Sequence, residues 1–487
     1  MQNLPIKLYR AAQARELDRL AIEEYGIPGI KLMSRAGKAL FQSLQQHWPQ
    51  ARSIAVFCGA GNNAGDGYIV ARLALIAGYS VCVYAVSDPE QLKGDARTAW
   101  QQYLEVDGRV LPFQAKLAIN TEVVVDALLG TGLDRAVSGL YADAIATINA
   151  SAAKVVAVDI PSGLHADTGH VLGDAVVADV TVTFIALKQG LFTGLAAEVC
   201  GEIEYASLAV PEAVFSQVLA SATRVLYHSM SPRKRCAHKG NNGHVLIIGG
   251  DKGYSGAARL AGEAALRVGA GLVSVATRAE HAGLMNLNRP ELMWQGVENA
   301  DQLLPLLEKA GVIVLGPGLG QSGWSKELFR AAIESAKPMV IDADGLNLLA
   351  VSPSYNDNRV LTPHPGEAAR LLSCSTADIQ QDRFTAAVAI QAKYGGVAIV
   401  KGAGTVIASE HELAVVNTGN PGMGSGGMGD VLAGVIGGLL AQGLSLQQAA
   451  QQGVYIHGLA ADKAALQDGE RGLLASDLMS YLRILVN

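Results

Sequence analysis

The sequence predicts an α/β protein of two domains, each built around a parallel β-sheet. Short, almost continuously apolar runs alternate with helical stretches, which is the pattern of parallel strands covered by helices on both faces. The chain has 487 residues, a length that suggests two or three domains. Half of the residues are hydrophobic, so each domain can bury a substantial core.

The first series of elements occupies about the first 220 residues. Residues 10–48 are expected to form two amphipathic helices, because glycine and proline interrupt the apolar pattern at 26–29. Each apolar run after them is followed by a loop with glycine or aspartate and by a helical stretch, as in β–α units. These predicted strands lie at 53–58, 81–86, 122–129, 155–160 and 180–185.

A second series begins after about residue 225. Its apolar runs lie at 244–250, 272–277, 312–320, 338–345, 359–367 and 397–405. The polar, basic segment LYHSMSPRKRCAHKGNNG separates the two series and has the composition of a linker. We place the boundary near 220–235 and predict domains at 1–220 and 230–487. The two halves share no motif spacing, so no internal repeat is expected.

Composition excludes several classes of protein. The formal charge of −6 argues against a nucleic-acid surface. The five cysteines are scattered without a CxxC pair, which fits a reducing compartment and argues against a disulfide framework or a zinc site. No signal-peptide pattern and no apolar run of membrane-spanning length is present. We expect a cytoplasmic protein that acts on small molecules, forms a homo-oligomer, and has neither nucleic acid nor membrane as a partner.

The glycine-rich segment NTGNPGMGSGGMGDVLAG at 417–434 is the first candidate site. Gly424, Gly426, Gly427 and Gly429 can bring backbone N–H groups close to an anion, at the start of a helix predicted from about 427 to 440. Asp430 falls in the first turn of that helix. A carboxylate beside a bound phosphate is unfavourable unless it accepts a proton from a hydroxyl that attacks phosphorus. The alternative is a helix cap; four glycines favour phosphoryl chemistry.

This segment resembles the signature of the ribokinase-like superfamily, and the longer string TGNPGMGSGGMGDVLAG resembles its NAD(P)H-hydrate dehydratase family. Other loops agree with that family and together cover most of residues 230–487. They are GDKGYSGAARLA (250–261), LGPGLG (315–320), DADGLNLL (342–349), TPHPGE (362–367) and VKGAGT (400–405).

The resemblance implies roles for individual residues of the second half. His364, Gly320 and Ala258 would contact the hydrated nicotinamide nucleotide. For Asp342 and Asp344 we favour capping of the helix that follows them over the alternative role, assistance to a magnesium ion. The loop after the last apolar run could equally be a hairpin turn. The adenine nucleotide would contact Lys401, Gly402, Ala403, Gly404, Thr405 and Gly429.

In the first half, FCGAGNNAGDGYIVARLA (57–74) follows a predicted strand and opens a helix. Gly59, Gly61 and Ala64 fit GxGxxG/A, with Asp88 near the place of the ribose-binding acid, which alone would weakly suggest a dehydrogenase. However, Asn62, Asn63 and Asp66 add hydrogen-bonding side chains that such a turn does not need. Asp126 and Asp159 end two other predicted strands. Either could be a capping residue, but three polar loops at one sheet edge predict a pocket.

This half resembles the NAD(P)H-hydrate epimerase domain over roughly residues 1–220. The resemblance implies that Asp159 is the acid/base and that Asn63, Asp126 and Ser162 hold a potassium ion. That family usually shows GNNGGDG, and Ala64 replaces one glycine; a positive φ there would carry a cost and lower the epimerase rate. The implied substrate-binding residues are Asn62, Asn63, Ala64, Gly65, Asp66, Gly130, Thr131, Gly132, Leu133, Asp134, Arg135 and Ala136.

Together the two resemblances imply a metabolite-repair enzyme. It would epimerise the R and S forms of NADH hydrate and NADPH hydrate at C6. It would then dehydrate the S form with ADP, releasing AMP and phosphate, with Mg²⁺ and K⁺ as cofactors. ADP is chosen because chains with the epimerase fused first resemble the ADP-using branch. The alternatives are a small-molecule kinase of the same superfamily, a catalytically silent first domain, and a dehydrogenase, for which no hydride-transfer constellation is seen.

Overall fold

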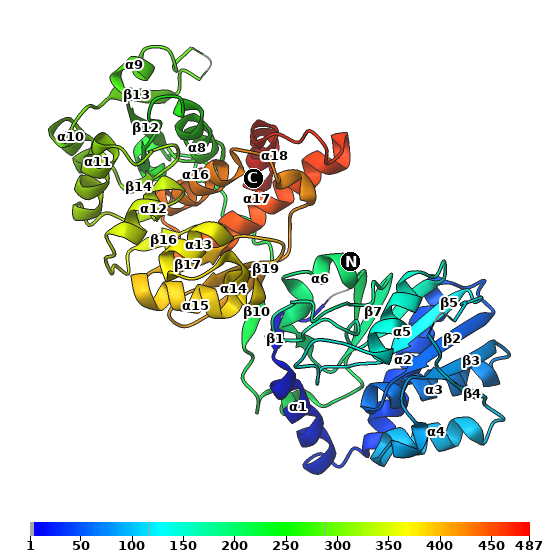
Figure 1. The fold of residues 1–487 in the computed structure, drawn as a ribbon. Coiled ribbons are helices and arrows are strands. Elements are labelled where there is room, and N and C mark those ends of the chain that lie inside the picture. The colour runs from blue at the N-terminus through cyan, green and yellow to red at the C-terminus, as the bar shows by residue number, and fades with distance from the viewer. Residues whose placement is uncertain (1–3, 116, 288) are drawn as a thin grey trace. The chain divides into compact units, whose positions relative to one another are not determined.

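A computed structural model describes residues 4–115, 117–287 and 289–487 (Figure 1). The chain divides into two compact units, Met1–Thr223 and Arg224–Asn487. No helix among the described residues is both long enough and apolar enough to cross a membrane. Each unit has an α/β fold, which confirms the predicted fold class.

The N-terminal unit contains a parallel sheet with the order β4-β3-β2-β5-β6-β7-β9. The order reverses between β2 and β5, so the loops after these strands diverge and open a crevice at their carboxyl ends. The strands are β2 (Ser53–Cys58), β3 (Ser80–Ala85), β4 (Val110–Pro112), β5 (Val123–Ala127), β6 (Lys154–Val158), β7 (Val180–Phe184) and β9 (Glu202–Ala206). A small ribbon pairs β1 (Lys7–Tyr9) with β8 (Leu187–Lys188) and β10 (Ala222–Arg224).

Helices cover both faces of this sheet, as the apolar strands predict. Alternate residues of β2 belong to two different apolar clusters. Ile54 and Val56 lie in the cluster formed with the first four helices, whereas Ala55 and Phe57 lie in the cluster formed with α5. The break predicted at 26–29 separates α1 from α2. The helices are α1 (Ala11–Glu23), α2 (Gly29–His47), α3 (Asn62–Ile76), α4 (Gly94–Leu104), α5 (Leu140–Asn149), α6 (Ala196–Val199) and α7 (Glu212–Phe215).

The C-terminal unit contains strands in the order β13-β12-β11-β14-β15-β16-β17-β18-β19. The first seven are parallel, whereas β17, β18 and β19 pair in antiparallel fashion. The sequence reading did not predict that antiparallel end. The strands are β11 (His244–Ile248), β12 (Leu272–Thr277), β13 (Leu292–Gly296), β14 (Val312–Leu315), β15 (Met339–Ile341), β16 (Arg359–Leu361), β17 (Val397–Val400), β18 (Thr405–Ala408) and β19 (Leu413–Val416).

Helix α16 lies against both α8 and the sheet because its glycines allow close approach. A Cβ on Gly434 would lie 2.0 Å from the carbonyl oxygen of Ala261 in α8, and one on Gly437 would lie 2.4 Å from a methyl of Val314 in β14. The helices are α8 (Ser255–Arg267), α9 (Ala279–Ala282), α10 (Ala300–Lys309), α11 (Gly323–Glu334), α12 (Asp344–Val351), α13 (Pro365–Leu372), α14 (Thr376–Gln381), α15 (Arg383–Tyr394), α16 (Met428–Ala441), α17 (Leu446–Asp468) and α18 (Leu478–Leu485).

Candidate active sites

The candidate site of the C-terminal unit is built on the first turn of α16. The helix begins at Met428, close to the predicted position, and Gly427 before it has φ +92°, a conformation that favours glycine. Asp430 lies in that first turn. Burial and the neighbouring carboxylate of Asp342 raise its pKa to about 7, while Lys401 opposes the rise. A carboxyl group that titrates near neutrality is suited to accept and release a proton.

Lys401, which follows β17, forms an ion pair with Asp342, which follows β15. Its Nζ lies 3.0 Å from Oδ1 of Asp342 and 3.9 Å from Oε2 of Glu367. Thr362 also donates to Asp342 Oδ1, at 2.8 Å. Burial disfavours the charge on Lys401, but the two carboxylates outweigh it and raise the pKa of the amine. A Cβ on Gly429 would lie 3.2 Å from this Nζ. Because glycine has no side chain, the start of α16 can lie close to the ion pair.

The interpretation of Asp342 and Asp344 as helix caps is wrong. The N-cap of α12 is Ala343, which makes no side-chain capping bond. Asp342 is instead committed to Lys401 and Thr362. Asp344 accepts hydrogen bonds from the backbone N–H of Gly320, at 2.9 Å, and from the side chain of Asn347. The carboxylates of Asp342 and Asp344 both raise the pKa of Asp430, so they belong to the same site as Asp430.

The loop Lys401–Gly404 is a hairpin turn between β17 and β18, which was the alternative left open. Its carbonyl at Ala403 accepts a hydrogen bond of 2.7 Å from Nη2 of Arg383. Gly402 has φ +154°, and a Cβ there would lie 2.1 Å from Nη1 of Arg383. Arg383 is buried, and its Nε and Nη1 have no hydrogen-bond partner among the described residues. Sequence analysis missed this residue because its position in α15 shows no motif.

The three residues implied to contact the nicotinamide nucleotide have different environments. His364 caps α13, since its Nδ1 accepts the N–H of Gly366 at 3.0 Å, and its side chain is half-exposed. Gly320 has φ +71° and donates to Asp344. Ala258 is fully buried in α8, beneath Gly250. Only His364 therefore presents a side chain to solvent.

The N-terminal unit has a cavity of about 550 Å³ at the reversal point between β2 and β5. Of the predicted substrate-binding residues, Ala64, Gly65 and Ala136 do not line it. The predicted residues that do line it are Asn62, Asn63, Asp66, Gly130, Thr131, Gly132, Leu133, Asp134, Arg135 and Asp159.

Asp159 lies in this cavity beside a buried lysine. It has φ +67°, and its Oδ1 accepts hydrogen bonds from Lys188 Nζ, Thr183 Oγ1 and the N–H of Phe184. Sequence analysis missed Lys188 because a lysine that is 2 % exposed has no distinguishing local pattern.

Two other carboxyl groups that line the same cavity have raised pKa values. Burial raises the pKa of Asp18 to about 6, and burial together with Asp159 and Asp18 raises the pKa of Asp66. Lys188 opposes both shifts. The buried amine of Lys188 thus acts on the carboxyl groups of Asp159, Asp18 and Asp66, and this arrangement is able to move protons. Asp18, in α1, was not predicted.

The three residues implied to bind potassium lie together beside Leu129. The carbonyl oxygen of Leu129 accepts from Asn63 Nδ2 at 3.2 Å and from Ser162 Oγ at 3.1 Å. Asp126 accepts the backbone N–H of Ser162 at 2.8 Å and its hydroxyl at 2.6 Å. Burial raises the pKa of Asp126 to about 6. In the part of the chain that the structure describes, no group of three or more His, Cys, Asp or Glu side chains could hold a metal ion.

Two expectations about the N-terminal loop need correction. Ala64 lies inside α3 and is not among the residues with positive φ, so the expected backbone cost of alanine is absent. The tight position is Gly65, where a Cβ would lie 2.6 Å from Met33 Sδ. Asp88 accepts from the N–H of Glu90 and caps the short helix Pro89–Gln91. Asp88 is therefore a capping residue, and the dehydrogenase alternative no longer has a candidate for the ribose-binding acid.

The two folds and their sites define a protein that combines a Rossmann-like unit with a ribokinase-like unit carrying an aspartate at a glycine-rich helix start. Comparison with known proteins is specific. Residues 245–483 match the family of NAD(P)H-hydrate dehydratase, and residues 29–190 match that of the YjeF-related protein N-terminus. The chain belongs to the bifunctional NAD(P)H-hydrate repair enzymes. The predicted family and the repair of NAD(P)H hydrate by epimerisation and dehydration are confirmed.

Two relatives named bifunctional NAD(P)H-hydrate repair enzyme align with this chain over nearly their whole length. That of Coxiella burnetii is 51% identical over 99% of both chains, and that of Escherichia coli K12 is 46% identical over 100% of this chain and 95% of its own. Among solved structures, an ADP/ATP-dependent NAD(P)H-hydrate dehydratase of Bacillus subtilis, co-crystallised with ATP and Mg²⁺, is 28% identical. It covers 53% of this chain and 93% of its own, with a TM-score of 0.48.

Proposed function

We propose that the C-terminal unit, residues 230–487, dehydrates the S form of NADH or NADPH hydrate by phosphoryl transfer from ADP. The observation that carries the proposal is Asp430 at the start of α16, with its pKa raised to about 7, beside the Lys401–Asp342 ion pair. A helix N-terminus binds anions through its free N–H groups and its dipole. A phosphate held there would meet a carboxylate able to take a proton.

The chemistry follows from the poor leaving ability of hydroxide. Asp430 accepts the proton of the C6 hydroxyl while that oxygen attacks the terminal phosphorus of ADP, and the bond from phosphorus to the bridging oxygen breaks to release AMP. The C6–O bond of the phosphate ester then breaks as the ring-nitrogen lone pair forms a C=N bond. Loss of the C5 proton restores the dihydropyridine. The glycine-rich start of α16 supports the charge on the transferring group.

A magnesium ion would be bound through the phosphates and a carboxylate, as is usual for this ion. Asp344 has both oxygens engaged, whereas Oδ2 of Asp342 accepts no hydrogen bond from the described residues. Asp342 is therefore the better of the two predicted ligands. When bound, the ion would neutralise phosphate charge during transfer. The nucleotide would lie on the hairpin Lys401–Thr405 and Gly429.

We propose that the N-terminal unit, residues 1–220, interconverts the two C6 epimers in the cavity at the β2/β5 reversal. The ring-nitrogen lone pair can expel the C6 oxygen as water when an acid supplies a proton, and water can return to either face. Asp159 is the proposed acid/base, and Lys188 holds its carboxylate in place. Asn63, Asp126 and Ser162 supply the oxygen-rich surroundings that a potassium ion prefers, next to the carbonyl of Leu129.

One assay tests both proposals. The two hydrate epimers are separated chromatographically and followed over time with ADP, with ATP, and with neither nucleotide. We expect epimerisation without nucleotide, and loss of the S form with recovery of dihydronicotinamide absorbance only with nucleotide, faster with ADP. Faster dehydration with ATP would overturn the choice of ADP. A stable phosphorylated product would indicate a kinase instead. Replacing K⁺ by tetramethylammonium should slow only the epimerisation.

A further inference from the structure

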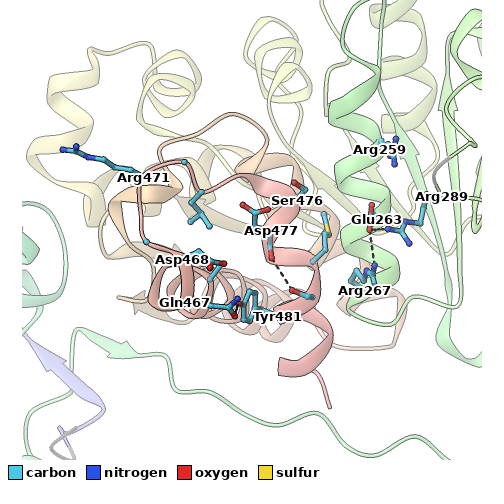
Figure 2. A pocket seen from close by; sticks show the side chains of 16 residues that line it. Arg259, Glu263, Arg267, Arg289, Gln467, Asp468, Arg471, Ser476, Asp477 and Tyr481 are labelled. Atoms are coloured by element: carbon cyan, nitrogen blue, oxygen red, sulfur yellow. Dashed lines mark hydrogen bonds and ion pairs between the residues drawn. The ribbon is translucent and has the colours of Figure 1, made fainter.

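A second cavity, of about 620 Å³, lies in the C-terminal unit and contains none of the residues assigned above to dehydration. It is bounded by α8, by the end of α17 and by the segment that leads into α18 (Figure 2). Its volume is in the range of sites for small ligands, roughly 300–1,000 Å³. Its lining combines arginines, carboxylates and hydroxyls with a few apolar side chains, those of Ala464, Leu473 and Met479.

One wall of the cavity carries more guanidinium than carboxylate groups. Arg259, Glu263 and Arg267 follow one another at four-residue spacing along α8, and therefore share one face of the helix. Arg289 joins them from the segment before β13, and both Arg267 and Arg289 share the same oxygen of Glu263. Figure 2 shows this cluster around Glu263.

One of these arginines keeps its donors for a ligand. Arg259 makes no ion pair or side-chain hydrogen bond with any described residue. Nε of Arg289 also has no hydrogen-bond partner in the described chain, but this atom is buried from solvent. One carboxylate thus faces three guanidinium groups, and the excess positive charge at this wall suits an anion with several acceptor oxygens, such as a phosphate.

The opposite wall presents groups that accept hydrogen bonds. Asp468 ends α17, and Asp477, Ser476 and Ser480 lie at the start of α18. Asp477 already accepts the backbone N–H of Leu474 at 2.9 Å through Oδ2, which leaves its other oxygen for a ligand. Carboxylates and hydroxyls that line the same cavity as an arginine cluster fit the hydroxyls of a sugar that carries a phosphate at the other end.

The lining of the cavity contacts the glycine-rich loop of the catalytic site. Ser425, in that loop, donates from Oγ to the carbonyl oxygen of Leu473, which lines the cavity, at 2.9 Å. A Cβ on Gly427 would lie 2.6 Å from Leu260 and 3.1 Å from Ala475, the neighbours of the lining residues Arg259 and Ser476. A ligand that fixes this wall would therefore also restrict the loop that precedes Asp430.

We propose that this cavity binds a sugar phosphate, as a free metabolite or as the ribose-phosphate part of a nucleotide, at a site separate from the catalytic one. The phosphate lies on the Arg259–Arg267–Arg289 wall and the sugar hydroxyls on the Asp468–Asp477 wall. The binding itself does not depend on the proposed function.

The test measures binding of ribose 5-phosphate to the full-length protein by calorimetry. Arg289→Gln should weaken binding about tenfold or more, and it leaves Glu263 paired with Arg267. Arg259→Gln is a second variant that removes no internal ion pair. Arg471→Gln is the matched control, because it loses the same charge at the rim while its side chain points away from the arginine cluster (Figure 2). Circular-dichroism melting verifies the fold of each.

Binding that survives in Arg471→Gln and Arg383→Gln, but not in Arg259→Gln or Arg289→Gln, is the expected result. Equal weakening by Arg471→Gln would mean that only the net charge matters, and loss in Arg383→Gln would place the ligand in the catalytic site. Inorganic phosphate is the second probe; binding as tight as that of ribose 5-phosphate would contradict the role of the acidic wall. No binding to the parent protein would overturn the proposal outright.

Discussion

The amine of Lys401 lies 3.0 Å from the carboxylate of Asp342, and this ion pair lies against the first turn of α16. The pair keeps a negative charge near Asp430, and that charge adds to burial in raising the pKa of Asp430 to about 7. The positive charge of Lys401 limits the rise. Asp342 and Lys401 therefore act in opposite directions on the protonation of the proposed base, and each can be changed separately.

The first prediction concerns the pH dependence of dehydration. A base must be ionised to act, so kcat/KM for the S hydrate should rise about tenfold per pH unit below pH 7 and level off above it. The rate of epimerisation, measured in the same samples, should not show this rise with pH, because epimerisation does not use Asp430. A dehydration rate that is flat between pH 5.5 and 8 would contradict the role of Asp430 as base.

Asp430→Asn should slow dehydration strongly while making the C-terminal unit more stable at neutral pH. The pKa of Asp430 is raised on folding, so its favourable contribution is present below its unfolded pKa, near 4, and is lost as pH rises through about 7. The gain in Tm over the parent should therefore grow from pH 4 to 7 and stay constant above. Dehydration should fall by roughly 10²–10⁴-fold. Equal Tm differences at pH 4 and pH 8 would contradict the shift.

Lys401→Met should destabilise the unit and raise the pKa of Asp430. Removing one partner of a buried ion pair costs about 3–5 kcal/mol, because Asp342 is left as an uncompensated charge. The acid limb of the dehydration profile should move above pH 7. Adding Asp342→Asn to the variant should recover most of the lost stability in thermal melts. If the double variant melts no higher than the single one, Lys401 stabilises the fold in another way.

The sequence could predict elements and motifs, but not the residues that support them. Strand and helix positions followed from apolar runs, and the start of α16 from its glycines. Lys188 and Arg383 were missed because a buried cation has no local pattern and is identified only by the tertiary contacts that surround it. The antiparallel pair β18–β19 was missed since its short apolar runs resemble parallel strands. The cost assigned to Ala64 was wrong because its backbone is helical.

Arg383→Gln should weaken nucleotide binding more than hydrate binding. Arg383 supports the hairpin through Ala403 O and fills the space left by Gly402. Loss of the guanidinium should loosen the proposed nucleotide contacts and raise the KM for ADP about tenfold, with little change in the KM for the hydrate. Initial rates with each substrate varied in turn measure both constants. Equal increases in both would indicate general unfolding of the unit.

Lys188→Met should slow epimerisation strongly and leave dehydration intact. The amine is the buried donor to Asp159, and it also lowers the pKa of Asp18 and Asp66, which burial raises. Without it, both carboxyl groups should be protonated to higher pH. Asp159 should lose its fixed orientation, and the epimerisation rate should fall by roughly 10²-fold or more. Epimer-resolved chromatography measures that rate. Lys38→Met, at an exposed position of α2, is the matched control.

Because the S hydrate is dehydrated in the other unit, the Lys188→Met variant should still consume about half of an epimeric mixture with ADP. Complete consumption at the parent's rate would show that Lys188 and Asp159 do not catalyse epimerisation.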